Sequence, residues 1–190
     1  LLARLEGFTR EELTKAIERR RLVKALLQRG TLHGRLRVDE TVEAVVDPER
    51  RAHTMRNHTG THLLHRALRN VVGEGARQAG SLVTPDYLRF DYPFDRALTH
   101  DEKRAIEDEV RGIVRDDRPV TIEFMLMADA IEQGADAFFD EKYGETVRTI
   151  RVRDYSFELC GGTHCRATGQ IGAFQITGER SIGSGMRRIE

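Results

Sequence analysis

Apolar and polar residues recur along the chain with spacings that predict helices in some segments and strands in others. A Thr-x-x-Glu capping signal at residues 9–12 precedes helically spaced apolar positions, so a helix is expected over residues 10–29. Alternating apolar positions predict two short strands within 31–46, and a second helix is expected over 55–72, ended by Gly73. The first part of the chain is therefore expected to hold a helix and a small β piece.

After the second helix, short apolar runs are separated by glycine, proline and acidic turns. Thr99 is expected to open a long acidic helix over 100–117, and an apolar run predicts a buried strand over 120–127. A short helix is expected over 129–134. The remaining strands are expected over 80–92, closed by Pro93, and over 146–153, 157–159, 171–177 and 186–189. Because these elements do not alternate as strict βα units, they predict an α+β fold with a mostly antiparallel sheet packed with helices around a cleft.

The length of 190 residues is enough for one sizeable domain with an appendage. We therefore assign residues 1–53 to a small N-terminal helix and β piece, and residues 54–190 to the domain that carries the chemistry.

Composition excludes several classes of protein. Thirty-one basic residues balance thirty-one acidic ones, which argues against a uniformly positive surface that coats nucleic acid. The longest apolar stretch, 124–128, is far shorter than the roughly 20 residues of a membrane span, so no membrane role is expected. Two cysteines are too few for a disulfide framework, and the first turn is charged where a secretory signal would be apolar. We expect a piece of a cytoplasmic protein.

Two histidines of the second predicted helix form one candidate half of a metal site. His58 and His62 are four residues apart, which places both imidazoles on one face of a helix. This face lies almost opposite the apolar stripe that includes Leu64 and Leu68, so the pair is expected to face a cleft or solvent. His65 follows near the same face and is interpreted as a flanking residue.

The second half-site lies near the end of the chain. Cys160 and His164 are separated by a Gly-Gly-Thr segment that favours a tight turn over a helix. One sulfur with three imidazoles favours zinc over magnesium or calcium. The alternative is a closed zinc site that only fixes a loop to a helix. Cys165, next to His164, is interpreted as a buried small residue.

Several established chemistries do not fit these residues. A zincin needs glutamate directly after its first histidine, where this chain has Thr59, and a base deaminase needs motifs that are missing here. The sequence also contains no Gly-x-Ser-x-Gly nucleophile elbow, no Gly-x-Gly-x-x-Gly motif and no Walker loop.

Six segments follow one another along the chain: Arg56-Asn-His-Thr-Gly-Thr-His-Leu-Leu-His65, Gln78-Ala-Gly-Ser-Leu-Val83, Leu88-Arg-Phe-Asp91, Glu141-Lys-Tyr-Gly144, Glu158-Leu-Cys-Gly-Gly-Thr-His164 and Arg187-Arg-Ile-Glu190. In this order they resemble the motifs of the editing domain of alanyl-tRNA synthetase, over roughly residues 37–190. Freestanding AlaX-type deacylases share both metal half-sites, and the editing domain of threonyl-tRNA synthetase is a more distant relative. A Gly-Gly-Gln segment that usually precedes the domain is missing.

The resemblance implies a zinc-dependent deacylase that hydrolyses mischarged Ser-tRNA(Ala) and Gly-tRNA(Ala). A synthetic site for alanine cannot exclude glycine and rejects an added hydroxyl poorly, so a second, hydrolytic site is needed. The implied partners are the acceptor end of the alanine tRNA and the remainder of the synthetase. Since the aminoacylation domain is absent, this chain is not expected to make aminoacyl-tRNA. The alternative from another class is a nonenzymatic RNA-binding module with a structural zinc.

Two further sets of residues follow from the same resemblance. Gln78, Ser81 and Thr163 are candidates for the wall of the amino-acid pocket, with ordinary strand-end and turn residues as the alternative. Candidates for contacts with tRNA phosphates are the arginines, for which surface salt bridges are the alternative: Arg66, Arg69, Arg187 and Arg188.

Overall fold

The computed structural model describes residues 46–137 and 144–190 of the chain. Contacts between residues divide the chain into two compact units, Leu1–Arg51 and Ala52–Glu190. The helix predicted over 10–29 and the strands predicted within 31–46 lie essentially outside the described residues. The assignment of residues 1–53 and 54–190 to separate domains therefore stays a prediction.

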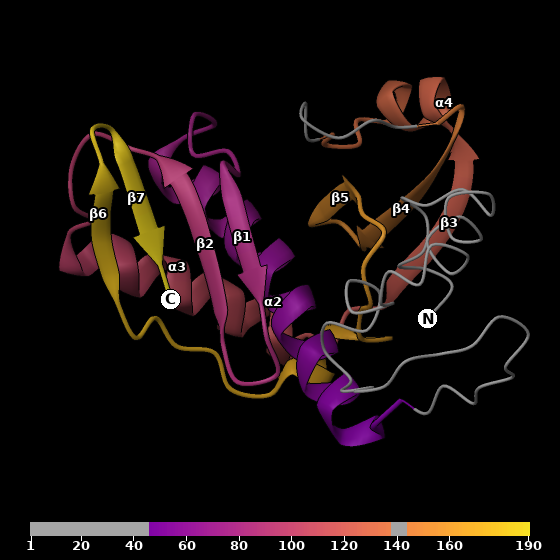
Figure 1. Cartoon of the computed structure of the whole chain (residues 1–190), viewed down its shortest axis with the longest axis horizontal. Helices are drawn as coiled ribbons and strands as arrows, with labels where there is room; N and C mark the ends of the chain where they lie inside the picture. Colours follow the sequence, from indigo (N-terminus) through magenta and orange to yellow (C-terminus); the bar gives the residue numbers. More distant parts are fainter. Residues whose placement is uncertain (1–45, 138–143) are drawn as a thin grey trace, which may run out of the picture. The chain divides into compact units, whose positions relative to one another are not determined.

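The described residues form an α+β fold with two antiparallel sheets, which confirms the predicted fold class (Figure 1). The first sheet has the strand order β1-β2-β7-β6 and the second has the order β3-β4-β5. All pairings between these strands are antiparallel. The elements are α2 (Pro48–Val72), β1 (Gly80–Val83), β2 (Leu88–Pro93), α3 (His100–Arg115), β3 (Val120–Leu126), α4 (Met127–Glu132), β4 (Thr146–Val152), β5 (Ser156–Leu159), the 3-10 helix η3 (Thr168–Ile171), β6 (Glu179–Gly183) and β7 (Met186–Ile189).

Both long helices begin at side chains that cap their free backbone N–H groups. The Asp47 carboxylate accepts hydrogen bonds from the backbone of Glu49 and Arg50 at 2.9 and 3.0 Å, and Pro48 occupies the first turn. Helix α2 therefore begins earlier than the predicted residue 55. Thr99 opens α3 with a reciprocal capping box to Glu102, as predicted.

Two strand predictions were wrong. The expected strand over 80–92 is a hairpin, because Thr84 accepts hydrogen bonds from the backbone of Asp86 and Tyr87 and closes a turn between β1 and β2. Residues 171–177 form no strand, and the backbone N–H of Ile176 donates to a Glu107 carboxylate oxygen at 2.7 Å instead. The neighbouring strand β6 was not predicted.

Strand β3 was predicted as buried, and this was also wrong. Apart from Val120 its residues are largely exposed, and the Phe124 side chain is 66% exposed. The apolar run is typical of a buried strand, but β3 forms the edge of its sheet and presents Ile122, Phe124 and Leu126 on one face.

The main core forms around α2, which is enclosed on several sides. Residues Thr59 to His65 of this helix are all buried. The core joins both helices to both sheets through Leu63, Leu64, Leu68, Ile106, Val110, Phe90, Tyr92, Ile189, Ile150 and Val152. Among the described residues, no helix has the length and apolar character needed to cross a bilayer.

Candidate metal centre

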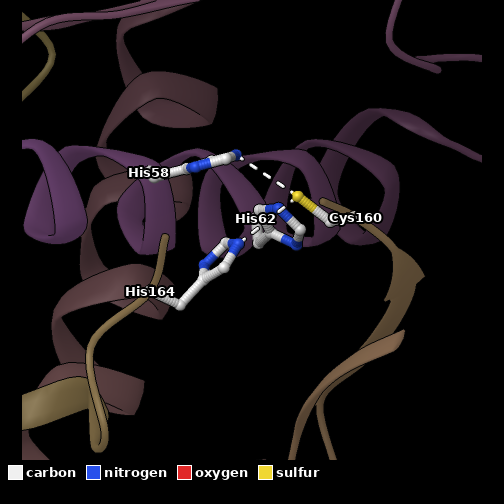
Figure 2. A group of neighbouring side chains, drawn as sticks. All are labelled: His58, His62, Cys160 and His164. Carbon is white, nitrogen blue, oxygen red and sulfur yellow. Dashed lines mark hydrogen bonds between the residues drawn. The ribbon is translucent and has the colours of Figure 1, made fainter. Parts of the chain in front are cut away.

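Four side chains from α2 and the loop after β5 converge on one point (Figure 2). The ligand atoms of His58, His62, Cys160 and His164 all lie within 4.8 Å of one another. Cys160 Sγ is 3.4 Å from both His58 Nε2 and His164 Nε2. A tetrahedral zinc site with bonds of 2.0–2.3 Å would have ligand–ligand separations of about 3.3–3.8 Å. The structure thus brings together all four residues predicted as ligands, in a group that could hold a metal ion.

The loop after Cys160 can approach helix α2 closely because Gly162 has no side chain. Cys160 extends the ladder of β5, since its backbone N–H donates to Arg148 O at 3.1 Å. A Cβ atom on Gly162 would lie 1.8 Å from His58 Cε1, so any side chain there would collide with the imidazole. The second glycine of the motif is therefore required by the close approach of backbone and ligand.

The burial of one of the two helical histidines differs from the prediction. The pair was expected to face a cleft or solvent, but only His58 stays partly exposed, whereas His62 is 5% exposed. His164, from the other half-site, is 4% exposed. The physical reason is that the Glu158 side chain of β5 and the loop after β5 both contact this face of α2. His58 and Cys160 are partly buried, and the following Gly161 is exposed. Access to the cluster is therefore from the side of His58 and Cys160.

Glu158 supports the cluster from behind and had no assigned role in the sequence prediction. This carboxylate is 3% exposed. Its Oε2 lies 2.8 Å from His62 Nδ1, and its Oε1 lies 2.9 Å from His65 Nδ1. A carboxylate can only accept here, which places the proton on Nδ1 of His62 and leaves Nε2 for a metal. His65, interpreted as a flanking residue, thus binds the other oxygen of the same carboxylate.

The sequence contained a signal for Glu158. It precedes Cys160 by two residues, and side chains two apart in a strand point to the same face. A carboxylate on the same face as a predicted ligand is a candidate for orienting the neighbouring imidazoles.

Thr59 orients the fourth ligand and was also missed. Its Oγ1 lies 3.3 Å from His164 Nδ1 and accepts a hydrogen bond from the backbone of Cys165 at 3.0 Å. Thr59 is fully buried. Thus the residue that replaces the glutamate of a zincin has a positioning role here. Cys165 is itself buried in the core, and burial raises the pKa of its thiol.

The electrostatics of the cluster favour a thiolate and a nearby positive charge. Burial alone would raise the pKa of Cys160, but hydrogen bonds from His164, His58 and His62 lower it far below the ordinary thiol value. Burial would lower the pKa of His62, but the Glu158 carboxylate and the Cys160 thiolate together raise it to about 10. Burial and the charge of His62 lower the pKa of His164 to about 3. The buried Glu158 carboxylate and the partly buried Cys160 thiolate therefore lie on either side of His62, a setting that a bound cation would neutralise.

The candidate pocket residues occupy different places around the centre. Thr163 is partly buried and directly precedes His164, within the loop that carries the ligands. Gln78 is partly buried just before β1, and Ser81 is exposed within it. Ser81 is paired with Phe90, whose ring centroid is 5.4 Å from that of His65. Their assignment to an amino-acid pocket stays a prediction.

Three of the four candidate arginines form ion pairs within the chain. Arg69 contacts the carboxylates of Glu74 and Asp136. Arg187 Nε donates to Glu179 at 2.5 Å, and Arg188 donates to both carboxylate oxygens of Asp91 at 2.7 Å. The fourth, Arg66, is partly buried and lines a separate cavity. Surface salt bridges, the alternative to tRNA contacts, are thus present at three of these arginines in this structure.

Comparison with known proteins shows which proteins this chain is similar to. Residues 147–190 match the family model described as "Threonyl and Alanyl tRNA synthetase second additional domain". The chain is 49% identical to an alanine–tRNA ligase of Fervidobacterium nodosum over 87% of the chain and 19% of that protein. It is 52% identical to that of Desulfitobacterium hafniense over 87% of the chain and 18% of the relative, and 47% identical to that of Pelotomaculum thermopropionicum over 94% and 20%. The chain spans about a fifth of the length of the curated relatives it matches.

Proposed function

Because the chain belongs to the alanyl-tRNA synthetase family, as its motifs predicted, we propose that it hydrolyses mischarged Ser-tRNA(Ala) and Gly-tRNA(Ala) as the editing domain. In this proposal residues 54–190 form the deacylase domain. The substrates are esters between an amino acid and the tRNA 3′ end, and the second reactant is water. The reaction breaks the bond between the acyl carbon and the ribose oxygen, releasing the amino acid and an intact tRNA hydroxyl.

The convergent cysteine and three histidines are the observation that carries the proposal. The donor set of one thiolate and three imidazoles suits zinc, which His58, His62, Cys160 and His164 would hold. Zinc bound there would supply a Lewis acid for an ester carbonyl or lower the pKa of a water. The exposure of Gly161 beside Cys160 and His58 supports access of a substrate to this side.

Selectivity is proposed to come from hydrogen bonds rather than from size. Gln78, Ser81 and Thr163 offer amide and hydroxyl groups that can bind the hydroxyl of a serine ester. An alanine ester would leave one such group unpaired, which costs about 1–3 kcal/mol and gives roughly tenfold to hundredfold selectivity. Glycine lacks the hydroxyl, so its hydrolysis rests on tolerance of a smaller side chain.

The acceptor end of the tRNA is proposed to lie along the arginines named above. Phosphate oxygens would then compete with the carboxylates that hold three of them. The Arg66 guanidinium, which makes no hydrogen bond or ion pair among the described residues, needs no such exchange. The remainder of the synthetase would deliver the tRNA, and the cytoplasm, where tRNA is charged, is the proposed location.

A second candidate function is a nonenzymatic RNA-binding module with a structural zinc. The observation in its favour is that four protein donors suffice to fill a tetrahedral zinc shell. Such a module would bind tRNA without hydrolysing its ester. The two candidates are therefore separated by measuring hydrolysis and binding on the same sample.

The test measures deacylation of seryl, glycyl and alanyl esters of the alanine tRNA, with and without a chelator. We expect seryl and glycyl esters to be hydrolysed, the alanyl ester to be spared, and the chelator to stop the reaction. Gln78→Ala should lower the seryl-to-alanyl rate ratio, whereas Gln175→Ala, at an exposed position, should leave it unchanged. Equal rates for seryl and alanyl esters would overturn the editing proposal, and tRNA binding without hydrolysis would favour the second candidate.

A further inference from the structure

A cavity of about 290 Å³ lies apart from the metal centre, at the edge of β5. Helix α2 contributes Arg66 to its wall, and the hairpin between β4 and β5 contributes Arg151 and Arg153. Its remaining wall includes Asp136, Asp154 and Ser156. Three arginines from two segments of the fold thus line a single hollow.

A buried hydroxyl at this cavity lacks a partner. Ser156 is 8% exposed, and its Oγ has no hydrogen-bond partner among the described residues. A buried hydroxyl is usually hydrogen-bonded, and an unpaired one calls for a specific explanation such as a ligand. The hydroxyl can rotate to donate its proton to an anion held by the arginines.

The charges around the cavity favour an anion. Arg151 stacks on Phe157, with Cζ 3.5 Å from the ring centroid, and donates to Gln133 at 3.1 Å, so its position is fixed. The Arg66 and Arg153 guanidiniums form no ion pair or hydrogen bond within the described part of the chain. Of the two carboxylates, Asp136 is already bound by Arg69, and Asp154 belongs to the hairpin turn. Arg66 and Arg153 are therefore two cations at the cavity without a counter-charge among the described residues, whereas Arg151, paired with Phe157 in the sheet, lies on the face opposite Ser156.

We infer that this cavity binds a phosphate group. Guanidinium forks match the oxygens of a phosphate and form charge-assisted hydrogen bonds with it, and several forks can bind one phosphate from different sides. A hydroxyl donor such as Ser156 completes the kind of donor set that recognises this anion.

The position of the cavity identifies an RNA backbone as the source of the phosphate. Ser156, Glu158 and Cys160 lie at alternate positions along β5 and the residue after it, so they share one face. At about 3.3 Å per residue, Ser156 lies about 13 Å from the Cys160 ligand. On α2, Arg66 follows His62 by one turn on the same face. This part of the inference rests on the proposed function: an RNA strand with its 3′ ester at the metal centre would place an upstream phosphate here.

The first experiment titrates the metal-free chain with inorganic phosphate at constant ionic strength, against chloride. Arginine side-chain NMR signals report binding at each guanidinium. We expect saturable shifts for the arginines of the cavity, and a roughly tenfold or greater loss of affinity in Arg66→Gln and Arg153→Gln, because each removes charge-assisted hydrogen bonds. Ser156→Ala should weaken binding several-fold. Arg104→Gln, at an exposed position of α3, is the matched control and should bind like the wild type.

Two outcomes overturn the phosphate site. One is the absence of saturable shifts at the cavity, and the other is an equal loss of affinity in Arg104→Gln, which would show general charge screening. If a variant loses its folded NMR spectrum, Arg66→Lys and Arg153→Lys, which keep the charge, replace the glutamine variants.

A second experiment tests the RNA source. A trinucleotide should shift the same signals through its backbone phosphates, and the same trinucleotide with uncharged methylphosphonate linkages should shift them less. Equal shifts from both forms, or none from either, would overturn the RNA assignment while leaving the inorganic phosphate result intact. Because neither measurement needs metal or hydrolysis, failure here is distinguishable from failure of the deacylase proposal.

Discussion

The two sheets meet helix α2 with different kinds of side chain. The four-stranded sheet presents Phe90, Tyr92 and Ile189, all essentially fully buried in one apolar core with α2. The three-stranded sheet also adds Ile150 and Val152 to that core, but its last strand meets the helix with Glu158 and leads directly to Cys160. One side of the helix is thus bound by apolar packing, and the other by ionisable groups.

The two sides of α2 therefore contribute to different properties: one mainly to folding stability, and the other mainly to metal binding. Apolar packing of the kind on the first side contributes most of the folding free energy of a domain. Buried polar groups on the second side stabilise little, but fix the position and protonation of ligand atoms. Substitutions on the first side should therefore unfold the domain, whereas those on the second should change metal binding and hydrolysis in a protein that remains folded.

The largest expected effect breaks the polar side. Cys160→Ala should lower the rate of Ser-tRNA(Ala) hydrolysis more than a hundredfold, because even residues that only support metal ligands commonly contribute 10- to 100-fold. The far-UV circular dichroism spectrum should stay unchanged, since the core stripe of Leu64 and Leu68 does not involve the ligand. Bound zinc and the deacylation rate are measured on the same preparation. A variant that unfolds outright would show that the metal is structural.

The apolar side is tested by a pair of phenylalanines. Phe90→Ala should lower the free energy of unfolding by about 3–5 kcal/mol, because it removes a fully buried ring and leaves a cavity. Phe124→Ala, at a side chain that is 66% exposed, should change it by less than about 0.5 kcal/mol. Urea denaturation followed by circular dichroism gives both values. Similar losses in both variants would contradict the assignment of the core.

A third variant tests how the polar side fixes its imidazoles. Glu158→Gln keeps the shape but replaces the carboxylate between His62 and His65 with a neutral amide. We expect the affinity for zinc to fall 10- to 100-fold, as is usual when an outer carboxylate partner is lost. Competition with a chromophoric chelator measures the affinity. Glu132→Gln, on an exposed part of α4, is the control, and a matching loss there would contradict a specific role for Glu158.

The smallest expected effect concerns a helix that packs on the apolar side. Thr99→Ala removes the hydroxyl that caps α3 and leaves the backbone N–H of Glu102 without its partner. Loss of such a cap costs about 1 kcal/mol. For a domain of this size the melting temperature should fall by about 2–4 °C, with zinc affinity unchanged. A shift in zinc affinity would show that the two sides of α2 are coupled.

Local signals were sufficient for much of the fold and for the ligand set. The capping box at Thr99, the end of α2 at Gly73 and most strand positions follow from interactions within a few residues, which a sequence displays directly. The predicted ligands were found because their spacing within each half-site matches a helical turn or a glycine turn. The errors arose where a local pattern had two solutions, as in β3, whose apolar residues alternate with Thr121 and Glu123 before the apolar run that begins at Phe124.

The sequence by itself determined the α+β class, the family and the identity of four residues that could hold a metal. Only the tertiary structure decided that His62 and His164 are buried and that Glu158 of β5 lies against two histidines of α2. It also decided that Arg66 and Ser156, 90 residues apart, line one cavity. The physical reason is that residue spacing encodes directions along one helix or strand, whereas contacts between distant segments depend on how complete elements pack.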